Sequence, residues 1–191
     1  MRLRYSVGVS LRQPLPALRL PFLWLLTDER NDAGLEYAIA RLPAGSAVVY
    51  RHYHLAPPDR IARFEAVQRL CRAGGHVLIL ADSAMTAREW GADGIYGAPR
   101  ALYPARRDML RVATAHSVKE IGEANRMRAD AVMLSPVFPT RSHPGALVLG
   151  AVRFRLLASR ALMPVIALGG MDAKRADALE WPRYAAIDGL G

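Results

Sequence analysis

Eight short apolar runs, separated by amphipathic or proline-broken stretches, constrain the fold of this chain more than any other feature. The runs cover residues 21–28, 47–53, 76–82, 93–97, 110–117, 131–138, 164–170 and 184–190. Their apolar residues follow one another instead of alternating with polar ones, which is typical of parallel strands covered on both faces. Eight strands alternating with helices predict an α/β fold of the closed (β/α)8 type, a compact TIM barrel. We expect one such domain over residues 1–191, with residues 1–20 as an N-terminal tail.

An open, doubly wound sheet is the competing architecture. Such a sheet usually carries a glycine-rich G-x-G turn after its first strand. This chain has LLTDERND at residues 25–32 and no G-x-G there. The closed barrel is therefore preferred, and the open sheet is kept as the alternative.

The links between the predicted strands differ in length. Residues 59–74 have helical spacing, with Asp59 as a candidate N-cap and Cys71 on the buried face. Residues 117–120, SVKE, have the spacing of a capping box at the start of another helix. The links around residues 85–90 and 98–107 are short and proline-broken, so we expect abbreviated helices after the third and fourth strands.

Composition narrows the possible partners. Lysine and arginine outnumber aspartate and glutamate by 26 to 17, but they are scattered and do not form the dense basic stripe that nucleic-acid binding favours. Cys71 is the only cysteine, so there is no disulfide framework and a cytoplasmic protein is expected. Arg12 and Arg19 interrupt an N-terminus that superficially resembles a signal peptide, and no run is suited to span a membrane. Trp24 and Trp90, taken as exposed apolar residues, leave a homo-oligomer interface open.

The glycines and charged residues at the carboxyl ends of the strands are the candidates for chemistry, because active sites of TIM barrels form there. Gly169 and Gly170 run into a helix that Asp172 is expected to cap. This arrangement is suited to a bound phosphate or merely to a tight turn. Arg51 is suited to phosphate oxygens or, equally, to an ion pair with Asp28 or Asp82.

The roles of three further residues at this edge of the sheet stay open. Asp82 is a candidate magnesium ligand, although no second carboxylate is evident nearby. His116 follows the fifth strand and is suited either to structural packing or to a ligand. Asp188 would repel a phosphate bound at the glycines unless its side chain turned away or bound a metal ion.

The segment SPVFPTRSHPGALVLG, residues 135–150, is unusually constrained for a connector. Pro136 and Pro139 restrict its backbone, and Thr140 and Ser142 offer hydroxyl groups. We interpret it as a flap that covers a ligand after the sixth strand.

Four stretches of this sequence resemble the thiamine phosphate synthases and their TenI-type thiazole tautomerase relatives. SPVFPTRSH looks like the loop G-P-[IV]-[FY]-P-T-x-T-K, and TAHSVKEIGEANRMRADAV resembles S-x-H-[ST]-x-x-E-A running to G-A-D. PVIALGGM is similar to P-V-x-A-I-G-G-[IM], and GADGIY to G-A-D-G-V-H. The resemblance is strong from about residue 112 to residue 171 and weak before residue 72, and it implies a (β/α)8 barrel.

The resemblance implies a transferase of thiamine biosynthesis that joins an aminopyrimidine diphosphate to a thiazole phosphate and releases pyrophosphate with the help of Mg²⁺. It further implies small phosphorylated ligands as partners. By position, the implied residues are Arg51, Thr140, Ser142 and His143 for catalysis, Asp82 for the metal, and Thr114, His116, Pro136, Gly169, Gly170, Met171, Asp188 and Gly189 for substrate.

This sequence departs from the family pattern at several polar positions. Val49 and Tyr53 replace a Gln and a Lys, Ala81 an Asn, Arg100 or Ala101 the second metal Asp, His143 the loop Lys, and Asp188 a Ser. Each charged hydrogen bond lost is worth roughly 1.5–3 kcal/mol, so these changes bear directly on turnover. Two alternatives stay open: a catalytically impaired barrel that binds a phosphorylated ligand as a sensor or partner, and a TenI-like tautomerase using His143 or His116 as acid or base.

Overall fold

A computed structural model describes residues 20–104, 108–141, 145 and 147–187. The N-terminal tail through residue 19 and the predicted site residues Ser142, His143, Asp188 and Gly189 lie outside these ranges. The alternating apolar runs form a closed, all-parallel barrel in the order β1 to β8, which confirms the predicted TIM barrel over the open sheet. The strands are β1 (Leu23–Leu26), β2 (Ala47–Tyr50), β3 (Val77–Leu80), β4 (Gly94–Gly97), β5 (Leu110–Ala115), β6 (Ala131–Leu134), β7 (Val165–Leu168) and β8 (Tyr184–Ala186). Pairing of Trp24 with Ala185 between β1 and β8 closes the ring.

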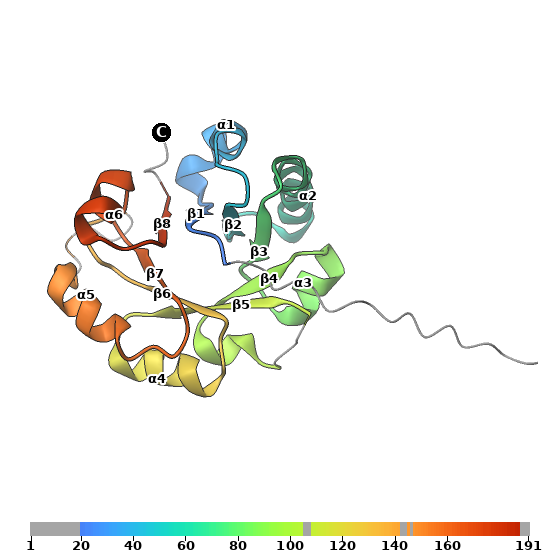
Figure 1. The fold of residues 1–191 in the computed structure, drawn as a ribbon. Coiled ribbons are helices and arrows are strands. Elements are labelled where there is room, and N and C mark those ends of the chain that lie inside the picture. The colour runs from blue at the N-terminus through green and yellow to red at the C-terminus, as the bar shows by residue number, and fades with distance from the viewer. Residues whose placement is uncertain (1–19, 105–107, 142–144, 146, 188–191) are drawn as a thin grey trace, which may run out of the picture.

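Helices surround the strands on the outside of the barrel (Figure 1). They are η1 (Glu29–Gly34), α1 (Leu35–Ala40), α2 (Pro57–Gly74), α3 (Ala84–Trp90), η2 (Pro99–Leu102), α4 (Val118–Arg126), α5 (Gly150–Ala158) and α6 (Ala173–Leu179), where η marks a 3-10 helix. After β3 and β4 the helices have only seven and four residues, which confirms the abbreviated links. The periodicity of the sequence did not predict η1 and α1, which are short.

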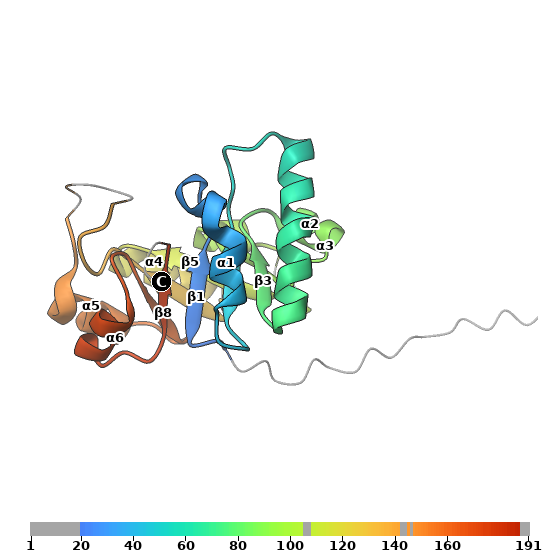
Figure 2. The ribbon, with the colours of Figure 1, turned by 90° about the horizontal axis from the view of Figure 1, so that it is seen from above.

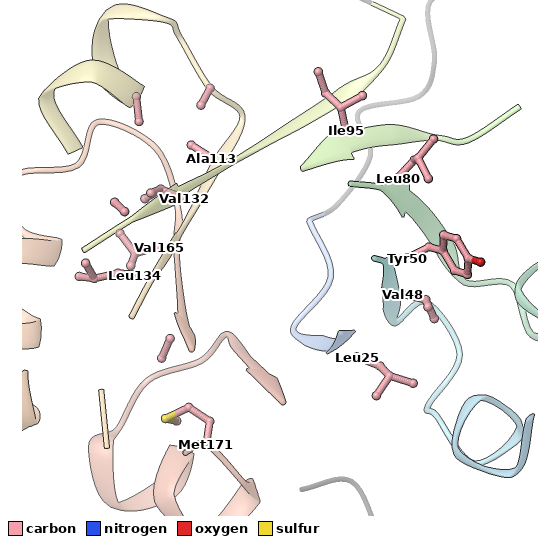
Figure 3. Close-up of a cluster of buried hydrophobic side chains, with 14 of the residues drawn as sticks. Leu25, Val48, Tyr50, Leu80, Ile95, Ala113, Val132, Leu134, Val165 and Met171 are labelled. Carbon is pink, nitrogen blue, oxygen red and sulfur yellow. The ribbon is translucent and has the colours of Figure 1, made fainter. Parts of the chain in front are cut away.

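Strand alternation divides the apolar core into two layers. Side chains such as Leu26, Val49 and Met133 fill the interior of the barrel. Their neighbours point outward and pack under the helices, and Figure 3 shows members of this outer cluster, among them Leu25 and Val48. Because both faces of each strand are covered, the consecutive apolar residues of the sequence are all accommodated. Full burial of one such side chain contributes about 1.5–3 kcal/mol.

Two tryptophans are not the exposed residues that the sequence suggested. Trp24 is completely buried in the barrel interior, where its Nε1 donates to the Pro21 carbonyl oxygen at 2.9 Å. Trp90 is half-buried and packs its ring 5.2 Å from that of Phe64. The proposed homo-oligomer interface therefore loses the residues on which it was based.

Helix α2 begins earlier than expected. It starts at Pro57 after Ala56, so Asp59 lies in its first turn and is not the N-cap. Proline is favoured at the first helical position because its fixed φ suits the helix and its missing N–H has no intrahelical partner there. Cys71 is buried on the inner face of α2, as predicted.

The longest connection in the barrel, residues 135–149 between β6 and α5, follows the carboxyl end of a strand. Figure 2 shows the link from β2 to α2 rising beyond the strands. Among the described residues, no helix has both the length and the apolar character needed to cross a membrane.

Candidate active site

A cavity of about 740 Å³ opens at the carboxyl ends of the strands. It brings together seven of the predicted site residues, which come from the segments after β2, β5, β6 and β7: Arg51, His116, Pro136, Thr140, Gly169, Gly170 and Met171. Its floor is apolar, with Leu26, Leu168 and Ala185 among the lining residues. Polar groups therefore surround an apolar base, as is common in sites for small ligands.

Arg51 is fixed by the two residues that follow β1. Its Nε donates to the Thr27 carbonyl oxygen and its Nη2 to Asp28 Oδ2, each at 2.8 Å. The expected ion pair with Asp28 is therefore present, and Arg51 also lines the cavity. Hydrogen bonding from Arg30, together with the charge of Arg51, holds the pKa of Asp28 below its usual value against the effect of burial. The guanidinium thus stays oriented at the cavity edge.

The backbone of Arg51 is held by a chain of hydrogen bonds between buried polar groups. The Arg51 amide donates to Thr27 Oγ1 at 3.0 Å, and Thr27 Oγ1 lies 2.7 Å from His52 Nδ1. Because that hydroxyl accepts from the amide, its own proton is available to Nδ1, which leaves Nε2–H to donate to Asp32 Oδ1 at 2.7 Å. Burial lowers the pKa of His52 despite this carboxylate, which favours the neutral ring. His52 is only 1% exposed, so this chain of hydrogen bonds lies inside the protein.

Gly169 and Gly170 are required by close approach of the segment after β6. Their φ angles are +96° and +61°, in the region that favours glycine. A Cβ on Gly169 would lie 2.7 Å from the Pro136 Cα, and one on Gly170 would collide with the Pro139 carbonyl oxygen. The glycine pair is therefore more than a tight turn, because it lets two segments of the cavity wall pack together.

Helix α6, which follows the glycine pair, is capped at its N-terminus by the side chain of Asp172. Asp172 Oδ1 accepts from the Arg175 amide at 2.7 Å, which confirms Asp172 as the N-cap of α6. Arg175 also lines the cavity, hydrogen-bonds to the Gly170 carbonyl oxygen and lies 5.5 Å over the Phe138 ring. This arginine was not predicted, although its position three residues after a helix cap at a glycine pair was a usable signal.

Arg141 and Tyr96 are two further cavity residues that the sequence did not single out. Burial raises the pKa of Tyr96 to about 12, so its phenol stays protonated at neutral pH and is able to donate a hydrogen bond. With Arg51 and Arg175, Arg141 makes three guanidinium groups from three separate parts of the chain at one cavity.

His116 is held in one orientation at the cavity wall. Its Nδ1 lies 2.9 Å from the Ser135 carbonyl oxygen, which fixes Nδ1 as the protonated nitrogen and leaves Nε2 as an acceptor. Its amide donates to Glu120 Oε2 at 2.7 Å, and Ser117 Oγ accepts from the Glu120 amide at 3.3 Å, as the predicted capping motif of α4 requires. His116 is therefore structurally anchored, and it also lines the cavity.

Asp82 and Thr114 do not line the cavity. Thr114 is half-buried on β5. Asp82 follows β3 in phase with the outward-facing Leu78 and Leu80, and its Oδ2 pairs with Arg60 Nη1 at 2.6 Å. The residue after β4 that would replace a second metal ligand, Arg100, is 81% exposed and pairs with Glu123. The predicted metal ligand is thus paired with an arginine and lies outside the cavity lining, and among the described residues no three acidic, histidine or cysteine side chains group together, so the described side chains offer no dedicated cage for Mg²⁺.

The family follows from comparison with known proteins. Residues 23–181 match the family model described as thiamine monophosphate synthase. The chain belongs to the thiamine monophosphate synthase family. The match includes every strand from β1 to β7 and the described cavity segments up to Arg175, so the family assignment rests on the barrel and the cavity together.

Individual relatives of this thiamine monophosphate synthase family agree in length and fold. A thiamine-phosphate synthase of Methylococcus capsulatus is 30% identical over 174 residues, covering 84% of this chain and 78% of the relative. One from Azoarcus sp. is 31% identical over 174 residues, covering 84% and 83%. The solved thiamine phosphate pyrophosphorylase from Pyrococcus furiosus superposes with a TM-score of 0.72 at 23% identity, covering 88% of this chain and 85% of that one, and it supports the barrel fold.

Proposed function

We propose that this member of the thiamine monophosphate synthase family is a transferase that joins an aminopyrimidine diphosphate to a thiazole phosphate, giving thiamine phosphate and pyrophosphate. The family match and the names of its relatives support this reaction. They favour it over a thiazole tautomerase or an inactive binding barrel. We expect the reaction to take place in the cytoplasm.

The reaction requires stabilisation of negative charge more than a strong base. The bond between the pyrimidine methylene carbon and the diphosphate oxygen breaks, and its electron pair leaves with pyrophosphate. The thiazole nitrogen then uses its lone pair to form the new carbon–nitrogen bond. Fixed cations next to the departing pyrophosphate would lower the barrier, because they stabilise the charge where it develops.

The convergence of Arg51, Arg141 and Arg175 on one cavity is the observation that carries this proposal. Guanidinium groups match phosphate oxygens in geometry and remain charged at all relevant pH values. We assign Arg51, Arg141 and Thr140 to the diphosphate, and the glycine pair with Arg175 to the thiazole phosphate. The apolar floor, with Pro136 and Met171 in the walls, offers surfaces for the two rings. His116 Nε2 is an acceptor for the pyrimidine amino group.

Four predicted residues complete the proposed site without structural support. Ser142 and His143 follow Thr140 closely in the sequence, and Asp188 and Gly189 come after β8 in the sequence. We retain them as proposed contacts. Magnesium would supply further positive charge to the diphosphate, but the described carboxylates do not form a site for it, so no step is assigned to it here.

A turnover assay tests the proposal. Purified protein is mixed with the aminopyrimidine diphosphate and the thiazole phosphate, with and without Mg²⁺, and thiamine phosphate and pyrophosphate are quantified. We expect equal amounts of both products, and a loss of at least about tenfold in kcat/KM for Arg51→Gln, because a charged hydrogen bond is worth about 1.5–3 kcal/mol. Arg88→Gln, which removes an exposed ion pair on α3, is the control. Folded protein that forms neither product would reject the proposed reaction.

A further inference from the structure

Asp82 is engaged on both carboxylate oxygens by groups of the protein itself. Oδ2 accepts from Arg60 Nη1 at 2.6 Å, and Oδ1 accepts from the Ser83 amide at 2.7 Å. Burial alone would raise the pKa of Asp82, but the hydrogen bonds from Arg60 and Ser83 outweigh it and hold the pKa below its usual value. The carboxylate is therefore charged and already paired with a cation.

Arg60 is itself held from several sides. Its Nε and Nη2 donate to the Arg51 carbonyl oxygen at 3.3 and 3.2 Å, and Nη2 also donates to the Ala81 carbonyl oxygen at 3.1 Å. The guanidinium carbon lies 5.4 to 6.0 Å from three aromatic ring centres, those of Tyr50, Tyr53 and Trp90. Only 13% of its side chain is exposed. This cation is thus part of the folded structure and not a mobile surface group.

The Arg60 contacts join the ends of two strands. Asp82 follows β3, the carbonyl oxygen that receives two of the bonds belongs to Arg51 after β2, and Arg60 lies on α2. The side chain of the same residue, Arg51, lines the cavity. Asp82 is therefore linked by hydrogen bonds through Arg60 to the backbone that carries a cavity cation.

We propose that Arg60 takes the place of a metal ion at Asp82 and that this pair positions Arg51, so that pyrophosphate is bound by arginine side chains and not through a metal held by Asp82. The inference rests on the proposed function in taking a diphosphate as the ligand. Any Mg²⁺ that enters with the diphosphate makes no bond to Asp82. Asp82 and Arg60 are accordingly positioning residues.

Calorimetric titration with inorganic pyrophosphate tests this assignment, in one buffer with EDTA and in another with Mg²⁺. The proteins are the wild type, Asp82→Asn, Arg60→Gln, the double variant, and Arg88→Gln as the control. Because Mg²⁺ changes the ligand as well, each variant is compared with the wild type in the same buffer. Thermal unfolding of every variant separates a loss of folding from a loss of binding.

We expect wild-type protein to bind pyrophosphate in EDTA. Asp82→Asn and Arg60→Gln should each weaken binding by about three- to tenfold, the range for one lost charged contact that acts indirectly. The factor should be the same in both buffers, and the double variant should lose no more than the larger single loss, since the two residues act through one path. Arg88→Gln should bind as the wild type does.

A metal role for Asp82 gives a different pattern. Its loss would weaken binding in Mg²⁺ and leave binding in EDTA unchanged, and Arg60→Gln would not reproduce it. Either that pattern or a wild type that binds no pyrophosphate in EDTA would overturn the inference. Pyrophosphate binding as described, without formation of thiamine phosphate in the turnover assay, would instead reject the proposed function and leave the inference standing.

Discussion

Gly169 lies directly against Pro136, so closely that a methyl group on the glycine would be 2.7 Å from the proline Cα. Gly169→Ala should therefore destabilise the fold by about 1–3 kcal/mol, from strain at φ +96° and from the collision, and should lower kcat/KM. Gly45→Ala is the matched control because Gly45 has φ +78° but open space around it. Urea unfolding measures both variants. Equal losses would show that crowding by Pro136 contributes nothing.

The hydroxyl group of Thr27 should contribute more to stability and activity than the shape of the Thr27 side chain. Thr27→Val leaves the Arg51 amide and His52 Nδ1 without their buried partner, at a cost of about 1–3 kcal/mol, whereas Thr27→Ser keeps the hydroxyl. We expect Val to lower both the free energy of unfolding and kcat/KM, and Ser to restore most of each. Denaturation and steady-state kinetics on the two variants provide the measurement. A serine variant as impaired as the valine variant would contradict this assignment.

Stability should fall as the pH drops below about 6.5, because His52 is buried with a lowered pKa. In the unfolded chain His52 binds a proton near pH 6.5, and in the folded chain only at lower pH, so the unfolded state binds more protons in between. Asp32 also has a lowered pKa, but its contribution is lost only at pH values nearer the ordinary carboxyl range.

The way the free energy of unfolding changes with pH should depend on His52. His52→Asn should flatten the change in the free energy of unfolding between pH 7 and pH 5, and Asn tolerates the φ of +30° at this position. His76 is buried with a lowered pKa as well, so part of the slope remains. A variant with an unchanged slope would show that His52 does not titrate in this range.

Arg175 should determine the affinity for the thiazole phosphate. Arg175→Gln is expected to raise the KM for that substrate by about tenfold, the equivalent of one charged hydrogen bond, with a smaller effect on the KM for the diphosphate. Lys174→Gln, at the adjacent exposed position of α6, is the control for net charge. Equal effects of the two substitutions would point to general electrostatics instead of a contact.

The architecture was predictable because a barrel strand is covered on both faces. Runs such as 77–80 and 165–168 are apolar throughout, and glycines and cap residues between them mark where helices begin and end. Once the barrel is assigned, the rule that chemistry lies at the carboxyl ends finds Arg51 and Gly169. These residues do line the cavity.

Because these runs are apolar throughout, the sequence does not show which side chains point into the barrel and which point outward. Ala81 and Asp82 follow a run without polar alternation, so the sequence does not tell which of the two faces the barrel interior. The partner that decides the role of Asp82, Arg60, is 22 residues away on α2. Tyr96 was missed for a related reason, since its place at the cavity depends on strand register and not on a local pattern, whereas Arg175 was marked by its position after a helix cap.

The three tryptophans of the chain occupy three different parts of the molecule. Trp24 lies inside the barrel, Trp90 is next to the Arg60 guanidinium, and Trp181 packs on Phe154 with ring centres 4.9 Å apart. Intrinsic tryptophan fluorescence thus reports on three separate regions of the molecule without an added label. In a variant that keeps only Trp90, with the other two tryptophans replaced by phenylalanine, emission would follow the surroundings of Arg60 while pyrophosphate is titrated. In a second variant that keeps only Trp24, emission would follow the integrity of the barrel in a parallel titration.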